Sequence, residues 1–327
     1  MRLILLLLAT LVLHWLPGAV LADAYDPLQI PAAFSAQVLD REAIDESRSR
    51  TIPLRIYLPA TSTPAAVVLF SHGLGGSREG SSFLGKHWAA RGYLAVFLQH
   101  PGSDESVWRD VAPAQRLKVL QKAANPQSFM QRVFDVAAVL DQLLVWNKAS
   151  GDTLSGRIDL DRVGMSGHSF GAVTTQAVSG QATANGRQMF LDKRIDAAII
   201  MSPSIPRQGS AEVAFRNVQL PWLLMTGSRD IAPIGNQDMA SRLGVYPALP
   251  EGGKYELVLD GAEHSAFTER PLPGEINARN PAHHPVILAL STAFWDAWLK
   301  QDAAAREWID GDAVRAVLAE ADRWQRK

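Results

Sequence analysis

Five short runs of consecutive apolar residues constrain the fold of this 327-residue chain most strongly. They occupy residues 65–70, 93–98, 197–201, 222–225 and 255–259. A strand that is apolar at successive positions is buried on both faces, which is typical of a mostly parallel sheet covered by helices. Residues 51–59 (TIPLRIYLP) instead alternate apolar and other side chains, which predicts one further strand that is only half-buried.

Amphipathic helical patterns lie between these runs. Apolar side chains recur every three or four positions from Phe129 to Leu144, as they do on one face of a helix. Residues 286–299 (VILALSTAFWDAWL) are apolar enough to form a largely buried helix. Because strands alternate with helices, we expect a three-layer α/β architecture in which helices flank a mostly parallel central sheet.

The chain has the length and texture of one α/β domain, which we expect to span residues 23–327. It would begin with a mixed polar lead-in at 23–50 and end in a helical appendage at 303–327. The connections 100–127 and 265–284 are long for this fold. Long loops on a compact domain are usually functional or mobile, so both are candidate walls or lids of a site.

Residues 1–22 are typical of a secretory signal peptide. Arg2 supplies a positive charge, Leu3 to Leu16 form an apolar stretch, and small residues near Ala22 favour cleavage there, although Ala24 is a second possible position. The stretch is shorter than the ~20 residues of a membrane-spanning helix, so a cleaved signal is favoured over an uncleaved anchor. The chain has no cysteine that could carry a lipid. We therefore expect a secreted or periplasmic protein without a stable membrane anchor.

Residues 167–171 (GHSFG) form a G-x-S-x-G motif around Ser169. A strand-like stretch at 162–166 precedes it and a helix-compatible stretch at 172–179 follows, which is the setting of a nucleophile elbow. The glycines two positions before and after the serine remove side chains that would collide in so tight a turn. The alternative interpretation is a glycine-bearing helix entry with a capping serine.

A serine hydroxyl becomes an effective nucleophile only when a neighbouring base accepts its proton. Asp230 and His264 follow later strands in the order serine, acid, histidine that an elbow requires. We expect His264 to act as general base and then general acid, and Asp230 to orient its ring and stabilise its charged form. Asp260 and Glu263 are competing carboxylates, but Asp260 is close to His264 in sequence and Glu263 is expected to point away.

A glycine-rich segment, 71–76 (SHGLGG), follows the strand at 65–70. We expect the backbone N–H groups of Leu74 and Phe170 to form an oxyanion hole there. The segment matches neither common phosphate-binding motif, so nucleotide binding is not expected. Phe83, Trp108 and Phe267 are the predicted lining of an apolar acyl pocket, from their places in loops that face the site.

Composition argues against several classes of function. The net charge of −1 provides no basic excess for phosphates, so we expect no nucleic-acid partner. His283 and His284 form a pair that resembles part of a metal site, but no carboxylate or cysteine lies at ligand spacing, which favours capping or packing. No metal and no cofactor are expected, and the oligomeric state stays open.

Three segments resemble a known family. Residues 65–76 (AAVVLFSHGLGG), 98–103 (LQHPGS) and 162–172 (RVGMSGHSFGA) are similar to the platelet-activating-factor acetylhydrolase-like branch of the α/β-hydrolases. Bacterial members of that branch are often described as dienelactone-hydrolase-like. The similarity runs from about Arg50 to Asp312.

The resemblance implies a triad of Ser169, Asp230 and His264, with Leu74 and Phe170 at the oxyanion hole. It also implies hydrolysis of short or oxidised acyl esters without calcium or another cofactor. True dienelactone hydrolases use a cysteine nucleophile, which this chain lacks, so that particular activity is not expected.

Together these features predict a serine carboxylic-ester hydrolase of the carboxylesterase or acetylhydrolase type. It would form an acyl-enzyme from small, short-acyl or lipid-like esters. An amide or peptide hydrolase with the same triad is one alternative, although the chain has no large extra domain of the kind some peptidases use to admit peptides. A non-catalytic, hydrolase-like binding protein is the other, although no triad member is missing.

Overall fold

A computed structural model describes residues 24–327 except 32–33, 233, 236, 272–274 and 276–277. The predicted signal peptide at 1–22 lies outside the described residues, so its cleavage after Ala22 stays a prediction. Among the helices of the described part, none is long and apolar enough to span a membrane.

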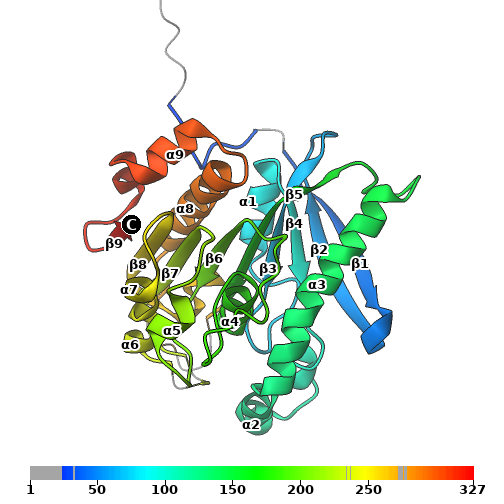
Figure 1. Cartoon of the computed structure of the whole chain (residues 1–327), viewed down its shortest axis with the longest axis horizontal. Coiled ribbons are helices and arrows are strands. Elements are labelled where there is room, and N and C mark those ends of the chain that lie inside the picture. The colour runs from blue at the N-terminus through cyan, green and yellow to red at the C-terminus, as the bar shows by residue number, and fades with distance from the viewer. Residues whose placement is uncertain (1–23, 32–33, 233, 236, 272–274, 276–277) are drawn as a thin grey trace, which may run out of the picture.

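A nine-stranded sheet crosses the molecule in the order β1-β2-β4-β3-β5-β6-β7-β8-β9 (Figure 1). The strands from β4 to β8 in this order are parallel, whereas β1, β2 and β9 pair antiparallel to their neighbours. The bounds are β1 Gln37–Asp45, β2 Arg50–Leu58, β3 Ala65–Ser71, β4 Leu94–Leu98, β5 Ile158–His168, β6 Ala197–Met201, β7 Trp222–Arg229, β8 Lys254–Glu263 and β9 Arg323–Arg326. The predicted α/β architecture with a mostly parallel sheet is confirmed.

Helices lie against both faces of the sheet (Figure 1). Their bounds are α1 Ser82–Ala90, α2 Pro113–Ala123, α3 Pro126–Lys148, α4 Phe170–Val178, α5 Ala211–Phe215, α6 Met239–Leu243, α7 Val245–Ala248, α8 His283–Trp298 and α9 Ala303–Asp310. Short 3₁₀ turns are η1 Glu46–Arg48, η2 Glu105–Val107, η3 His264–Phe267 and η4 Ala313–Val317.

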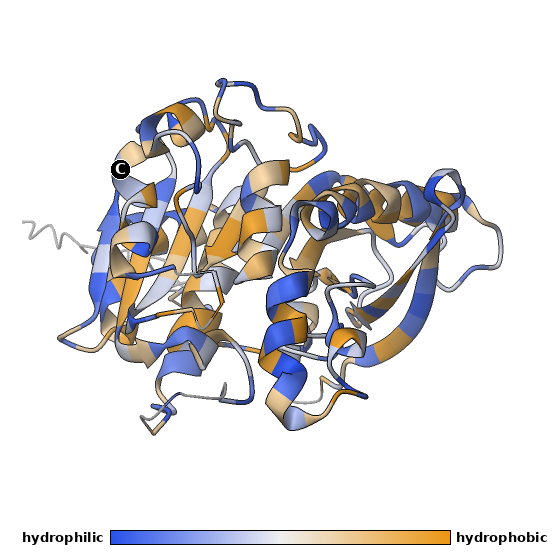
Figure 2. Cartoon of the chain, turned by 90° about the horizontal axis from the view of Figure 1, so that it is seen from below, coloured by the Kyte–Doolittle hydropathy of each residue, from blue (hydrophilic) through white to orange (hydrophobic). Residues whose placement is uncertain are grey.

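Strand β3 illustrates why the apolar runs predict burial on both faces. Val68 and Phe70 pack in a core beneath α1 and α8, whereas Val67 and Leu69 pack in a second core beneath α3. All four side chains are at most 1% exposed. Successive residues of a strand point to opposite faces, so only a strand covered on both sides needs apolar residues at every position. The central strands are accordingly coloured largely as hydrophobic in Figure 2.

Helix α3 begins where the sequence provides a cap. The Asn125 side-chain oxygen accepts a hydrogen bond from the Ser128 N–H at 2.9 Å, and Pro126 occupies the first turn, where a missing N–H has no cost. The helix covers the predicted range from Phe129 to Leu144 and continues to Lys148. Its buried face also contains two charged residues, Arg132 and Asp135, which are important below.

Three parts of the chain differ from expectation. The polar lead-in at 23–50 contains the edge strand β1, and the connection at 100–127 contains the helix α2. The helical appendage predicted at 303–327 is wrong in its last part, because α9 ends at Asp310 and β9 pairs with β8. Edge strands bury only one face and are held in place largely by backbone hydrogen bonds to a single neighbouring strand. Their sequences therefore show only a weak apolar pattern.

The strand β9 should therefore contribute to stability. Trp324 is 8% exposed, and its ring stacks on that of Tyr255 with centroids 5.7 Å apart. Trp324→Ala should lower the free energy of unfolding by about 3 kcal/mol, measured by guanidinium chloride denaturation. Arg326→Ala, an exposed change in the same strand, should alter it by less than about 0.5 kcal/mol. Equal effects of the two substitutions would mean that β9 is not part of the folded unit.

Candidate active site

The candidate triad lies at one edge of the sheet, where the parallel strands end. Ser169 follows β5, Asp230 follows β7 and His264 follows β8. The carboxyl ends of parallel strands lie at the same edge, and loops there are the usual place for ligands in open α/β sheets. The topology thus brings together three residues that lie far apart in the sequence.

Ser169 lies on a sharp turn between β5 and α4. Its backbone has φ of 59° and ψ of −113°, which is unfavourable for a residue with a Cβ atom. A Cβ atom at Gly171 would lie 1.8 Å from the Ser71 carbonyl oxygen, and one at Gly167 would lie 2.4 Å from the Gly171 oxygen. Both glycines are therefore required by close backbone approach, which is the geometry of a nucleophile elbow.

The three side chains form a continuous chain of hydrogen bonds. Ser169 Oγ lies 2.8 Å from His264 Nε2, and His264 Nδ1 lies 2.6 Å from Asp230 Oδ1. The competing carboxylate of Asp260 contacts Ser228 Oγ at 3.3 Å instead. This arrangement lets His264 accept the serine proton while Asp230 fixes the ring by binding its other nitrogen.

Asp230 is wholly buried among groups that stabilise its negative charge. Ser202 Oγ and Thr226 Oγ1 donate hydrogen bonds to Oδ2 at 2.6 and 2.8 Å, and Arg242 Nε lies 3.3 Å from Oδ1. Burial alone raises the pKa of this carboxyl, but His264, Arg242 and Ser202 outweigh that effect and hold the pKa well below its usual range. Asp230 is therefore an anion at every physiological pH.

His168, directly before the candidate nucleophile, supports the histidine of the triad. Its Nε2 donates a hydrogen bond to the His264 carbonyl oxygen at 2.9 Å, which requires the ring proton on Nε2. Burial lowers the pKa of His168 to about 3, with the nearby His264 acting in the same direction, so the ring is neutral. The contact holds the backbone of His264 against the elbow.

The two predicted oxyanion donors lie beside Ser169. A Cβ atom at Gly73 would lie 3.4 Å from Ser169 Cβ, which places the segment containing Leu74 next to the nucleophile. Phe170 is the first residue of α4, where N–H groups have no partner within the helix. Within the described part of the chain, no acceptor binds the N–H of Leu74 or of Phe170. Both remain available for an anionic oxygen.

The three predicted pocket residues lie in different surroundings. Trp108 is half-buried, and its Nε1 donates to the Gly75 carbonyl at 2.8 Å, so it packs on the glycine-rich segment. Phe83 is half-buried and stacks on His284 with ring centroids 3.9 Å apart. Phe267 is 0% exposed and belongs to the core, so its side chain presents no surface to a ligand in this conformation.

The neighbouring histidines His283 and His284 each contact a backbone carbonyl. His283 Nε2 lies 3.1 Å from the Asp260 oxygen, and His284 Nε2 lies 3.1 Å from the Thr268 oxygen. These contacts fit the packing interpretation of the pair. Among the described residues, no three His, Cys, Asp or Glu side chains are grouped as metal ligands would be.

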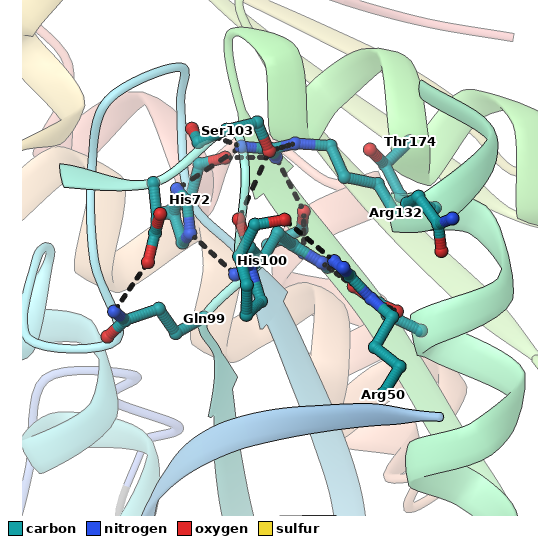
Figure 3. A network of polar contacts seen from close by, with 12 residues as sticks. Arg50, His72, Gln99, His100, Ser103, Arg132 and Thr174 are labelled. Atoms are coloured by element: carbon teal, nitrogen blue, oxygen red, sulfur yellow. Dashed lines mark hydrogen bonds and ion pairs between the residues drawn. The ribbon is translucent and has the colours of Figure 1, made fainter. Parts of the chain in front are cut away.

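Several residues around the site were not predicted from the sequence. Ser202 and Thr226 bind the Asp230 carboxylate, and Arg242 lies beside it. Arg132 extends from α3 toward the glycine-rich segment (Figure 3). One signal could have revealed Arg132, because a charge on the apolar face of an amphipathic helix needs a buried partner. Serine and threonine at strand ends carry no comparable signal.

Comparison with known proteins adds no assignment: no family model matches this chain, and no curated protein shows significant similarity to it.

Buried neutral histidines around the site should make the protein sensitive to mild acid. Burial holds the pKa of His72 well below its usual range and lowers the pKa of His100 to about 4 and that of His168 to about 3. Unfolded histidine takes up a proton near pH ~6.5. Below that pH the unfolded chain therefore binds protons that the folded chain does not, and stability is lost as the pH falls.

Urea unfolding measured between pH 7 and pH 5 should show this loss. Each histidine contributes a slope that approaches about 1.4 kcal/mol per pH unit toward pH 5, and His168→Asn should make the total slope shallower by up to that amount. A stability that does not change over this range, or an unaltered slope in the variant, would contradict the neutral, buried state of these rings.

Proposed function

We propose that this protein is a serine carboxylic-ester hydrolase with an α/β-hydrolase fold. The observation that carries the proposal is the chain of hydrogen bonds from Ser169 through His264 to Asp230, at 2.8 and 2.6 Å, on a turn that strains the serine backbone. Strain of this kind persists only where the surrounding structure enforces it, and it is concentrated at functional sites.

The position of each element supports the hydrolase fold. The nucleophile lies between a strand and a helix, the acid and the histidine follow later strands, and Leu74 lies in the connection between β3 and α1. These are the positions that the elbow, the triad partners and the second oxyanion donor occupy in α/β-hydrolases. The same positions are implied by the resemblance of residues 65–76 and 162–172 to the acetylhydrolase-like branch.

In the proposed reaction His264 Nε2 accepts the Ser169 hydroxyl proton while Oγ attacks the ester carbonyl carbon. The carbonyl π electrons move to oxygen, and the N–H groups of Leu74 and Phe170 bind the resulting anion. When this intermediate collapses, the carbon–oxygen bond to the alcohol breaks and His264 returns the proton to the departing oxygen. The products of this half-reaction are an acyl-serine and a free alcohol.

Water completes the cycle by the same route. His264 removes a proton from the water, and the water oxygen attacks the acyl carbon to form a second anion in the same oxyanion hole. Collapse releases the carboxylic acid and returns the proton to Ser169 Oγ. Throughout, the negative Asp230 stabilises the charged imidazole ring without accepting its proton.

Ser169→Ala should fold normally and lose at least about 10⁴-fold in kcat on p-nitrophenyl esters, because it removes the attacking oxygen. Ser47→Ala removes an exposed hydroxyl, in the turn between β1 and β2, that donates only to Asp45, and it should keep wild-type turnover. A panel of esters of increasing acyl length, with a matched p-nitroanilide, measures the substrate class. Near-normal ester turnover by Ser169→Ala would refute the proposal, as would cleavage of the anilide alone or wild-type inactivity on the whole panel.

A further inference from the structure

Arg132 is a buried cation directly behind the candidate oxyanion hole. Its side chain is 0% exposed, although arginine is almost never fully buried without a partner. Within the described part of the chain, no carboxylate forms an ion pair with it. Backbone carbonyls and serine hydroxyls surround the guanidinium instead (Figure 3).

These acceptors come from the two loops that follow β3 and β4. Nη1 donates to the His72 carbonyl oxygen at 2.7 Å, and Nε donates to Ser103 Oγ at 2.8 Å. Nη2 makes longer contacts with the carbonyl oxygens of Ser103 and Gly73, at 3.3 and 3.4 Å. One rigid, planar group thus joins both loops to α3.

The contact with Gly73 concerns the oxyanion hole directly. The Gly73 carbonyl and the Leu74 N–H belong to the same planar peptide group, so whatever orients one orients the other. His72 Nδ1 also lies 2.6 Å from this carbonyl oxygen. Because His72 Nε2 accepts a hydrogen bond from the His100 N–H at 3.1 Å, its proton is on Nδ1 and points to Gly73.

Hydrogen bonds to the carbonyl end of a peptide polarise its N–H end. The Gly76 N–H also binds the Gly73 oxygen, at 3.1 Å, so three donors reach it. Together they fix the plane of the Gly73–Leu74 peptide and strengthen the Leu74 N–H as a donor. Neither Arg132 nor His72 needs to touch the substrate to have this effect.

Arg132 also contacts the other half of the hole. Its Cζ atom lies 4.5 Å from the centroid of the Phe170 ring, which is cation–π distance. Phe170 carries the second oxyanion N–H. A single guanidinium therefore contacts both the Phe170 ring and the Gly73–Leu74 peptide, which contains the first N–H. Burial lowers the pKa of Arg132 to about 9, which leaves it positively charged at neutral pH.

A second group of contacts fixes the surroundings of this cation. Ser71 Oγ lies 2.9 Å from His100 Nε2, and His100 Nδ1 lies 2.9 Å from an Asp135 oxygen. Arg50 Nε donates to the same carboxylate at 2.7 Å. Arg132 and Asp135 lie on the same face of α3, three residues apart, so one helix holds the cation and the carboxylate that orders its neighbours.

We infer that Arg132 is a positioning residue that aligns the N–H groups of Leu74 and Phe170 toward an oxygen that becomes negative during acyl transfer. The inference rests on the proposed function, because that oxygen forms only if Ser169 attacks a carbonyl carbon. An interaction that strengthens as negative charge develops lowers the barrier without tightening substrate binding.

The test replaces Arg132 by Met, which keeps much of the length and removes the charge and the donors. Arg132→Met should lose about 10²-fold in kcat on a p-nitrophenyl ester, with KM unchanged, because oxyanion stabilisation is lost only in the transition state. The inhibition constant of an arylboronic acid, which forms a tetrahedral adduct on the serine, should rise by a similar factor. Arg132→Lys keeps the charge but not the planar guanidinium, so its kcat and its inhibition constant should lie between those of the wild type and of Arg132→Met.

Arg157→Met is the matched control. Arg157 also donates to two loop carbonyls, those of Pro59 and Thr61 at 3.0 Å each, but at the opposite end of the strands. It should leave kcat and boronic-acid binding unchanged. Activities are divided by the folded fraction from urea unfolding, and Arg132→Lys alone carries the test if the Met variant does not fold.

The outcomes separate this inference from the proposed function. Wild-type protein that hydrolyses no ester refutes both. If wild-type turnover is lost in Ser169→Ala but Arg132 variants keep kcat, or raise only KM, the ester hydrolase stands and the role of Arg132 is refuted. A loss of kcat without weaker boronic-acid binding also refutes it, because the oxyanion hole would then be intact.

Discussion

The close contact between the Ser169 turn and the end of β3 determines the geometry of the whole site. At Gly171 the helix α4 approaches the Ser71 carbonyl so closely that no side chain fits between them. This contact places the start of α4 beside the segment that contains Leu74, and it forces Ser169 into its unusual backbone conformation. The candidate nucleophile and both candidate oxyanion donors are therefore positioned by one backbone-to-backbone approach, which only glycine permits.

Two buried clusters of opposite charge lie on either side of this turn. Asp230 and its hydroxyl donors face the imidazole ring of His264, where positive charge develops in the proposed reaction. Arg132 lies behind the oxyanion donors, where negative charge develops. Charges that are fixed before the reaction do not have to reorganise as it proceeds. They therefore stabilise the developing charge more effectively than water does. The polarity of the site thus matches the direction of charge movement in acyl transfer.

Much of the architecture follows from local sequence patterns. The apolar runs that predict strands correspond to β3, β4, β6, β7 and β8, because strands covered on both faces require apolar side chains at every position. The meeting of Ser169, Asp230 and His264 was also predictable, since parallel strands end at one edge of a sheet. The edge strands β1 and β9 were not predictable, because backbone pairing orders them more than apolar burial.

The supporting residues were harder to predict than the triad. Ser202, Thr226 and Arg242 reach Asp230 from different elements, and their contacts depend on side-chain directions that no local pattern encodes. The pocket prediction shows the same difficulty, since Phe267 is near His264 in sequence but packs into the core. Motifs with fixed spacing identify groups on one turn, whereas groups that converge through tertiary packing require the structure.

The most direct test of the central claim is covalent labelling by a fluorophosphonate, followed by mass analysis of the intact protein and of its peptides. Such reagents modify a serine that an adjacent base has activated. The account predicts one adduct per chain, located on Ser169, and labelling that becomes far slower in His264→Ala. No adduct, an adduct on another serine, or equal labelling of the His264 variant would contradict it.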